Sequence, residues 1–198
     1  MTSSLSIDPE TSALLVMDFQ TAVVEMVPAD KDILVARTAD LIERARKAGM
    51  RVIYVVVGFR AGYPEVSPRN QSFGPIRESG RFAEGSAGTE VHPAVAPAPG
   101  EVVVTKHRVS AFAGTDLDMV LRANGIETLV LAGIATSGVV LSTIRHAADA
   151  DYKLVVVEDC CADRDAEVHR VLTEKVFVRQ AAIVKAEAVV EMLAARPA

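Results

Sequence analysis

Short uninterrupted hydrophobic runs alternate along the chain with longer segments in which hydrophobic residues recur every three or four positions. Such runs are typical of β-strands buried on both faces, and such segments are typical of amphipathic helices. The runs lie at residues 12–17, 51–57, 101–105, 127–132, 152–157 and 181–184. The periodic segments lie at residues 30–48, 114–123, 139–150, 165–178 and 186–195. The alternation predicts an α/β fold, a three-layer α/β/α sandwich whose mainly parallel, six-stranded sheet has helices on both faces.

Residues 58–100 break this pattern, because Gly, Pro, Ser, Asn and Arg dominate there and no periodicity persists. A loop this long inside a compact domain is usually a binding loop or a lid. The chain shows no internal repeat and no linker. We therefore expect a single domain over residues 1–198, in which residues 58–100 form a long active-site loop region.

Polar residues follow three of the predicted strands. Asp18 follows the first strand, Lys106 the third, and a turn of small residues, 133–138, the fourth. In a parallel sheet ligands bind beyond the carboxyl ends of the strands, so these features should share one edge. A carboxylate and an ammonium beside a helix N-terminus can tune each other's pKa and hold an anionic centre. Taken singly, Asp18 could be a loop cap and Lys106 a solvated residue at a strand end. The convergence of all three features on one edge favours a site.

Composition and charge narrow the classes of partner. The net charge is −5 and no cluster of Lys and Arg occurs, which argues against nucleic acid. No hydrophobic run reaches the roughly 18–20 residues of a membrane span. The N-terminus lacks the basic and apolar regions of a signal peptide, so we expect a cytoplasmic protein that binds a small molecule.

Cysteine and histidine are scarce. The two cysteines, Cys160 and Cys161, are adjacent, which excludes a disulfide framework and a zinc site of the CxxC type. The four histidines are scattered and form no HExxH or HxH motif. We expect neither a metal nor a cofactor.

Three segments, taken in order, resemble the isochorismatase-like hydrolase superfamily, also called the cysteine hydrolase family. They read LLVMDFQ at 14–20, KHRVSAFAGTDLDMVL at 106–121 and LVLAGIATSGVVLSTIRHAADADYKLVVVEDCCAD at 129–163. The resemblance spans nearly the whole chain and implies a Rossmann-like sheet with catalytic residues at Asp18 and Lys106. It also implies a cis peptide bond at Ile134–Ala135 and a homo-oligomer, either a dimer or a tetramer.

The chain departs from the family at the position of the nucleophile. The resemblance places Val139 where the family has its cysteine, and valine cannot form an acyl intermediate. Residue Ala135 stands where isochorismatases have Tyr, and 60–68 lacks their Gln pair, which disfavours isochorismate as the substrate. The segment VGFR at 57–60 also lacks the metal-binding His of nicotinamidases. We expect the substrate or an oxyanion to contact a set of residues formed by Gln20, Phe112, Ile134, Ala135, Ser137, Gly138 and Val139.

Three interpretations of the missing cysteine follow. The favoured one is a cysteine-free hydrolase in which Asp18 is the general acid/base and Lys106 supports it. In the second, an amide hydrolase uses a displaced nucleophile, for which the candidates are Thr136, Ser137, Cys160 and Cys161. In the third, the protein is an inactive family member that serves as a binding or regulatory module. Retention of both Asp18 and Lys106 argues against the third interpretation.

A small basic cluster follows the third strand. His107 and Arg108 adjoin Lys106 in the sequence. They are candidates to bind a substrate carboxylate, and surface or subunit-contact roles are equally open.

Overall fold

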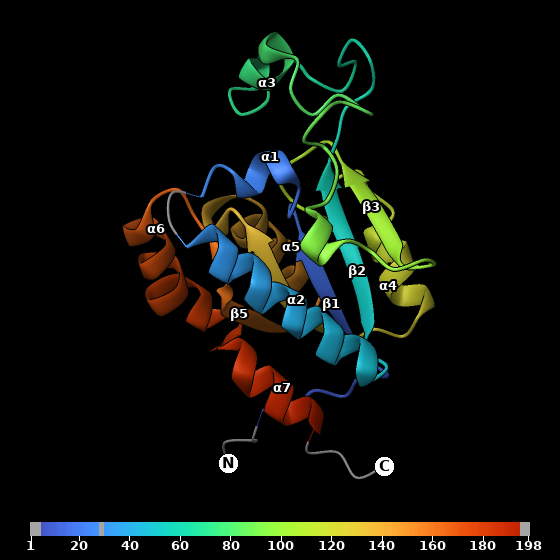
Figure 1. Ribbon diagram of the computed structural model, residues 1–198, viewed down its shortest axis with the longest axis vertical. Coiled ribbons are helices and arrows are strands. Elements are labelled where there is room, and N and C mark those ends of the chain that lie inside the picture. The colour runs from blue at the N-terminus through green and yellow to red at the C-terminus, as the bar shows by residue number, and fades with distance from the viewer. Residues whose placement is uncertain (1–4, 28–29, 195–198) are drawn as a thin grey trace.

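The computed structural model of the protein describes residues 5–27 and 30–194. Within these ranges the chain forms a six-stranded sheet in the order β3-β2-β1-β4-β5-β6, and every pair of neighbouring strands is parallel (Figure 1). The order reverses between β1 and β4, as in doubly wound Rossmann-like sheets. The predicted fold class is therefore confirmed. The strands are β1 (Ser12–Met17), β2 (Arg51–Val57), β3 (Val102–Lys106), β4 (Thr128–Ile134), β5 (Lys153–Ala162) and β6 (Ala182–Val184).

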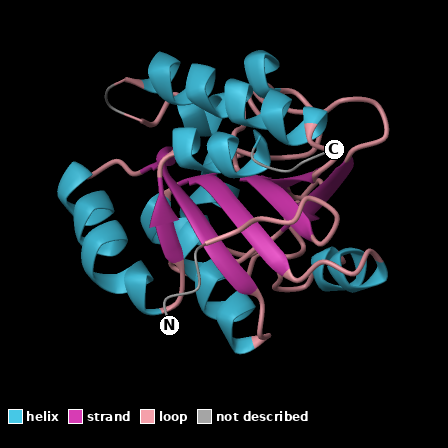
Figure 2. Cartoon of the chain, turned by 90° about the horizontal axis from the view of Figure 1, so that it is seen from below, coloured by secondary structure: helices cyan, strands magenta, loops and turns pink. Residues whose placement is uncertain are grey.

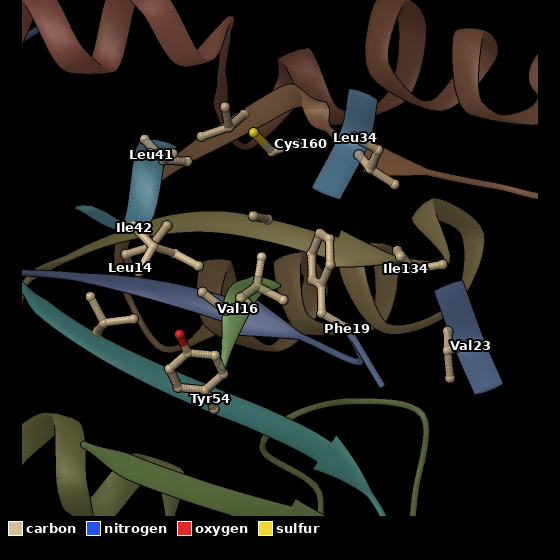
Figure 3. Close-up of a cluster of buried hydrophobic side chains, with 14 of the residues drawn as sticks. Leu14, Val16, Phe19, Val23, Leu34, Leu41, Ile42, Tyr54, Ile134 and Cys160 are labelled. Atoms are coloured by element: carbon tan, nitrogen blue, oxygen red, sulfur yellow. The ribbon is translucent and has the colours of Figure 1, made fainter. Parts of the chain in front are cut away.

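Helices cover both faces of the sheet (Figure 2). One face packs against α2 (Lys31–Lys47) and α7 (Ala186–Ala194), and the other packs against α4 (Leu117–Ala123) and α5 (Leu141–Asp149). All side chains of β1 are buried, because helices cover the sheet on both sides, and this explains why its sequence is a nearly continuous hydrophobic run. Its side chains alternate between two cores, with Leu14 and Val16 in the first and Leu15 and Met17 in the second. Figure 3 shows the first core, in which Leu14 and Val16 of β1 share one cluster with Leu41 and Ile42 of α2.

Two of the predicted helices are interrupted. The segment predicted as a helix over 139–150 starts with one π-helical turn at Thr136–Val140, where Gly138 has non-helical dihedral angles, and α5 begins only at Leu141. The helix predicted over 165–178 contains α6 (Ala166–Val171), a π-helical turn and a short 3-10 turn. The Thr173 hydroxyl donates to the carbonyls of His169 and Arg170, and such a bond competes with the regular helical ladder.

Other boundaries shift by a few residues. Helix α4 starts at Leu117, after a turn in which Gly114 has a positive φ of 75°. Strand β5 runs on to Ala162, beyond the predicted end at 157, through an irregularity in its pairing with β4. A short helix, α1 (Thr21–Val24), was not predicted because four residues are too few to show a period. The last residue of the helix predicted to end at 195 lies outside the described residues.

The loop region 58–100 contains a helix, α3 (Gly74–Ser79), and a 3-10 turn at Pro93–Val95. In Figure 1 the part around α3 extends beyond the carboxyl ends of β2 and β3. The buried ring of Phe59 anchors this region, since it packs against Tyr63 and Phe73 at centroid distances of 5.6 Å each. The loop region therefore has its own aromatic contacts, above the edge of the sheet where the strands end.

Candidate active site

A cavity of about 650 Å³ lies at the carboxyl ends of β1, β3 and β4. Asp18, Lys106 and Val139 all line it. The topological switch point between β1 and β4 is where a doubly wound sheet leaves such a crevice. Further lining residues come from α1 and the residues after it (Val23, Met26, Val27), from the loop region (Ser72, Phe73, Ile76, Phe82) and from the end of β5 (Asp163, Arg164).

Asp18 is held at the cavity by its backbone. It follows β1 directly and has a positive φ of 56°, a conformation that aspartate tolerates better than most residues. Its backbone N–H donates to the carbonyl of Val55 at 2.8 Å, which ties this bend to β2. The residue is 6% exposed, and its Oδ1 atom has no hydrogen-bond partner among the described residues. A buried acceptor without a partner, on the wall of a cavity, is available to a ligand or a water molecule.

Lys106 is the charged partner of this carboxyl. It closes β3, is 3% exposed, and its Nζ lies 2.9 Å from Oδ2 of Asp18. The same ammonium donates to the carbonyl of Arg108 at 3.2 Å. Burial raises the pKa of Asp18 above its ordinary value of 3.8, and the charge and hydrogen bond of Lys106 offset only part of this effect. The carboxyl consequently keeps its proton to a higher pH than an exposed aspartate does.

The turn after β4 forms the opposite wall. The peptide bond Ile134–Ala135 is cis, as the family resemblance implies. Five predicted residues of this turn line the cavity, namely Ile134, Ala135, Ser137, Gly138 and Val139. A Cβ on Gly133, just before them, would lie 3.0 Å from Cγ2 of Val140 and 3.1 Å from Cβ of Met17, so a side chain there would force these neighbours to shift. The glycine therefore lets the turn pack closely against β1.

Two side chains from distant elements hold the turn. The backbone N–H of Ser137 donates to Oδ2 of Asp163 at 2.7 Å. The hydroxyl of Thr136 lies 2.8 Å from Nδ1 of His169, which is on α6. Burial lowers the pKa of His169, and the nearby carboxylates of Glu158 and Asp163 oppose that shift. Neither contact was foreseen, because each joins residues far apart in the sequence.

Two predicted contact residues do not reach the cavity. Gln20 uses its side-chain amide on the backbone: Nε2 donates to the carbonyls of Val57 at 2.9 Å and Thr89 at 2.7 Å, and Oε1 accepts from the N–H of Val57. It thus ties the loop region 58–100 to β2. Phe112 lies in the core on the other face of the sheet, where its ring stacks on His146 at 4.5 Å. Neither residue is part of the cavity lining, since Gln20 bonds to the backbone and Phe112 packs in the second core.

The basic cluster after β3 is also turned away from the cavity wall. Nδ1 of His107 lies 2.5 Å from the carbonyl of Gly58, and the guanidinium of Arg108 donates to the carbonyl of His107 at 2.6 Å. Among the described residues, the basic side chains that line the cavity are Lys106 and Arg164, and Arg164 follows the end of β5. The rule that located Asp18 could have found it, since Arg164 also follows the carboxyl end of a strand.

Of the four candidates for a displaced nucleophile, Ser137 alone lines the cavity among the described residues. Thr136 is fully buried outside it. Cys160 and Cys161 are buried in β5, and Figure 3 shows Cys160 within the first core. Burial raises the pKa of the Cys160 thiol to about 12 and raises that of Cys161 as well. Both thiols are therefore poor nucleophiles at neutral pH.

Two features are absent from residues 5–27 and 30–194. No group of three or more His, Cys, Asp or Glu side chains there is arranged to hold a metal ion. No helix there is long and apolar enough to cross a membrane.

Comparison with known proteins places the chain in a family. The model of the isochorismatase domain matches residues 12–188. The chain is 31% identical to the isochorismatase family protein YecD of Escherichia coli O157:H7, over 96% of this chain and 100% of YecD. It is 36% identical to the ureidoacrylate amidohydrolase RutB of Variovorax paradoxus, over 78% of this chain and 70% of RutB.

A solved structure agrees with these relatives. The N-carbamoylsarcosine amidase of Thermoplasma acidophilum superposes with a TM-score of 0.73 at 31% identity, over 89% of this chain and 97% of the amidase. The matched segment includes every strand of the sheet and all the cavity-lining residues at the strand ends. The chain belongs to the isochorismatase family, a family of hydrolases.

Proposed function

We propose that the protein hydrolyses a small, carboxylated or carbonyl-bearing metabolite without a cysteine nucleophile, with Asp18 as general acid/base and Lys106 beside it. The observation that carries this proposal is the Asp18 carboxyl. It is buried on the cavity wall, its pKa is raised, and its Oδ1 atom is unpaired in the described part of the chain. A group whose pKa lies closer to neutrality exchanges protons more effectively under working conditions.

Water is the nucleophile in this mechanism. When ionised, Asp18 takes a proton from a water molecule while the water oxygen bonds to the substrate carbonyl carbon, and the C=O electron pair moves to the oxygen. The tetrahedral species then collapses, the bond to the leaving group breaks, and the leaving group takes the proton back from Asp18. On an enol ether, the protonated Asp18 instead gives its proton to the alkene carbon, and water adds to the cation that forms while Asp18 takes a proton back from that water. The resulting hemiketal then breaks its C–O bond as the proton of its hydroxyl passes to the leaving oxygen, which gives a carbonyl compound and an alcohol. In each case Lys106 stabilises the carboxylate while it is charged.

The relatives support testing C–N bonds first. RutB is named for the hydrolysis of ureidoacrylate, and the Thermoplasma enzyme is an N-carbamoylsarcosine amidase. Val139, at the position that the resemblance gives to the family cysteine, is 2% exposed and lines the cavity. An acyl-enzyme at this position is chemically impossible, which is why the proposal uses water directly.

A screen of ureido compounds, amides, esters and enol ethers tests the proposal. On any substrate found, Asp18→Asn should reduce kcat by about 100-fold or more, because an amide cannot exchange the proton. Asp165→Asn is the matched control, since Asp165 caps α6 and accepts from the N–H groups of Glu167 and Val168. Wild-type turnover should survive treatment with iodoacetamide, because Cys160 and Cys161 are buried. Loss of turnover after alkylation would indicate that a cysteine thiol is the nucleophile.

The binding-module interpretation makes a different prediction. Its supporting observation is that no cysteine lines the cavity among the described residues. Under that interpretation, ligands from the same panel bind tightly, none is turned over, and Asp18→Asn changes affinity alone. Turnover that Asp18→Asn abolishes would exclude it.

A further inference from the structure

Two arginines converge on one sulfur atom at the rim of the cavity. Met26 lines the cavity, and its Sδ accepts a hydrogen bond from Nη2 of Arg164, which lines the cavity too. Nη2 of Arg81, from the loop region 58–100, lies 3.6 Å from the same sulfur. The Arg81 guanidinium also sits over the ring of Phe82, 5.1 Å from its centroid, and Phe82 is another residue of the cavity wall. Both positive charges are therefore directed to one place on the rim.

Arg81 and Arg164 are among the arginines that form no ion pair in the described part of the chain. A thioether is only a weak, uncharged acceptor. Asp163, the acid next to Arg164, is already used, because its two oxygens accept from the backbone N–H groups of Ser137 and Arg164. Ion pairs to Asp or Glu are made by Arg37, Arg44, Arg46, Arg60, Arg122 and Arg170.

The inner end of the cavity has the opposite character. The ammonium of Lys106 is compensated there by Asp18 at 2.9 Å and by the carbonyl of Arg108. The guanidinium groups of Arg81 and Arg164, in contrast, form no ion pair with a carboxylate among the described residues. Bringing two like charges together is unfavourable, and an anion between them removes that repulsion. Guanidinium groups fit a carboxylate well, because their N–H donors match its two oxygens.

We propose that Arg81 and Arg164 form a carboxylate-binding site at the rim, so that the substrate is an anion whose charged end is held there. The lining of the cavity also includes apolar side chains, among them Phe73, Ile76 and Val139. An uncharged, mainly apolar stretch of the substrate therefore spans the distance to the reacting group. The placement of that reacting group at Asp18 rests on the proposed function, whereas the carboxylate site itself does not.

Equilibrium binding tests the carboxylate site without any turnover. The probes are acetate with acetone, and benzoate with acetophenone, because each ketone has nearly the shape of its carboxylate but no charge and cannot be hydrolysed. Binding is followed by NMR titration at low ionic strength, where charge interactions are least screened. We expect each carboxylate to bind about tenfold or more tightly than its ketone, as for hydrogen bonds to charged groups.

Single substitutions test whether the preference for carboxylate over ketone depends on the two arginines at the rim. Arg81→Ala and Arg164→Ala should each remove most of the preference for carboxylate, and Arg164→Lys should keep part of it. Arg170→Ala is the matched control, since it removes the same charge from a side chain that is paired with Glu167 and Glu174. It should leave all the affinities unchanged.

Three outcomes would overturn the carboxylate site. They are equal affinity for carboxylate and ketone, a preference that survives both alanine variants, and failure of both carboxylates to bind at millimolar concentrations. If the preference is lost in the rim variants but the substrate screen finds no hydrolysis, the carboxylate site stands and only the proposed function fails. If Asp18-dependent hydrolysis is found without a carboxylate preference, the reverse holds.

Discussion

The Asp18 carboxyl is subject to two opposing effects, and their balance decides what it can do. Burial favours its neutral form, whereas the ammonium of Lys106 at 2.9 Å favours the charged form, and burial has the larger effect. The result is an aspartic acid whose pKa is raised although it is in contact with a lysine. A surface aspartate paired with lysine would have a lowered pKa instead, as Glu43 has beside Lys47.

The pH dependence of the reaction should report this balance. If Asp18 must be ionised for water attack, the acidic limb of the profile of kcat/KM lies above pH 3.8, because its pKa is raised. Lys106→Met removes the charge that lowers this pKa, so the limb should move to higher pH and kcat/KM at neutral pH should fall about tenfold or more. The measurement is kcat/KM against pH for the wild type and the variant. A limb that stays in place in Lys106→Met would contradict the assignment to Asp18.

At the scale of elements, the turn after β4 and the start of α6 depend on two aspartates that are close in sequence but differ in role. Asp163 accepts from Ser137 in the turn, whereas Asp165 accepts from Glu167 and Val168 and so caps α6. One aspartate connects two elements across the cavity wall, and the other stabilises a single helix. Comparing variants of Asp163 and Asp165 therefore distinguishes an effect on the active-site turn from an effect on the stability of the fold.

Asp163→Ala and Asp165→Ala should each lower the free energy of unfolding by about 1 kcal/mol, because each removes hydrogen bonds to backbone N–H groups. Only Asp163→Ala should also lower kcat/KM, since it frees the turn that carries Val139. Denaturant unfolding gives the stability of each variant, and kcat/KM on a substrate found in the screen gives the activity. Equal losses of activity in the two variants would show that the turn does not depend on Asp163.

At the scale of the whole molecule, the doubly wound topology brings three strand ends and the loop region 58–100 around one cavity. Helix α6 is coupled to this region through the contact between His169 and Thr136. Because His169 is half-buried and its pKa is lowered, the folded protein favours its neutral form. The stability of the whole fold is thereby linked to pH.

We expect the free energy of unfolding to fall as the pH drops below 6.5, the ordinary pKa of histidine. In that range the unfolded chain binds a proton at His169 and the folded protein does not, so protonation favours unfolding. Above pH 6.5 both states are neutral at this residue, and the contribution to stability is complete. His169→Asn should reduce the decrease between pH 7 and the lowered pKa, as measured by denaturant unfolding at a series of pH values. An unchanged pH dependence in the variant would contradict the shift.

The sequence by itself was sufficient to predict the six strands and the main helices in their order along the chain, and the polar residues at the edge of the sheet. Hydrophobic runs such as 12–17 are local signals, and the strand-end rule converts them into the common location of Asp18 and Lys106. The motif after β4 likewise predicted the turn that lines the cavity. These features depend on neighbouring residues and on a general property of parallel sheets, so no tertiary contact had to be known.

Only the tertiary structure decided what the individual polar groups contact. The side-chain amide of Gln20 donates to the backbone carbonyls of Val57 and Thr89. The guanidinium groups of Arg164 and Arg81 both contact the sulfur of Met26, and the ring of His169 contacts the hydroxyl of Thr136. Each of these contacts joins segments far apart in the chain, so no local pattern encodes it. The pKa of Asp18 was undecided for the same reason, because it depends on how deeply the fold buries the carboxyl and on how close the fold brings Lys106.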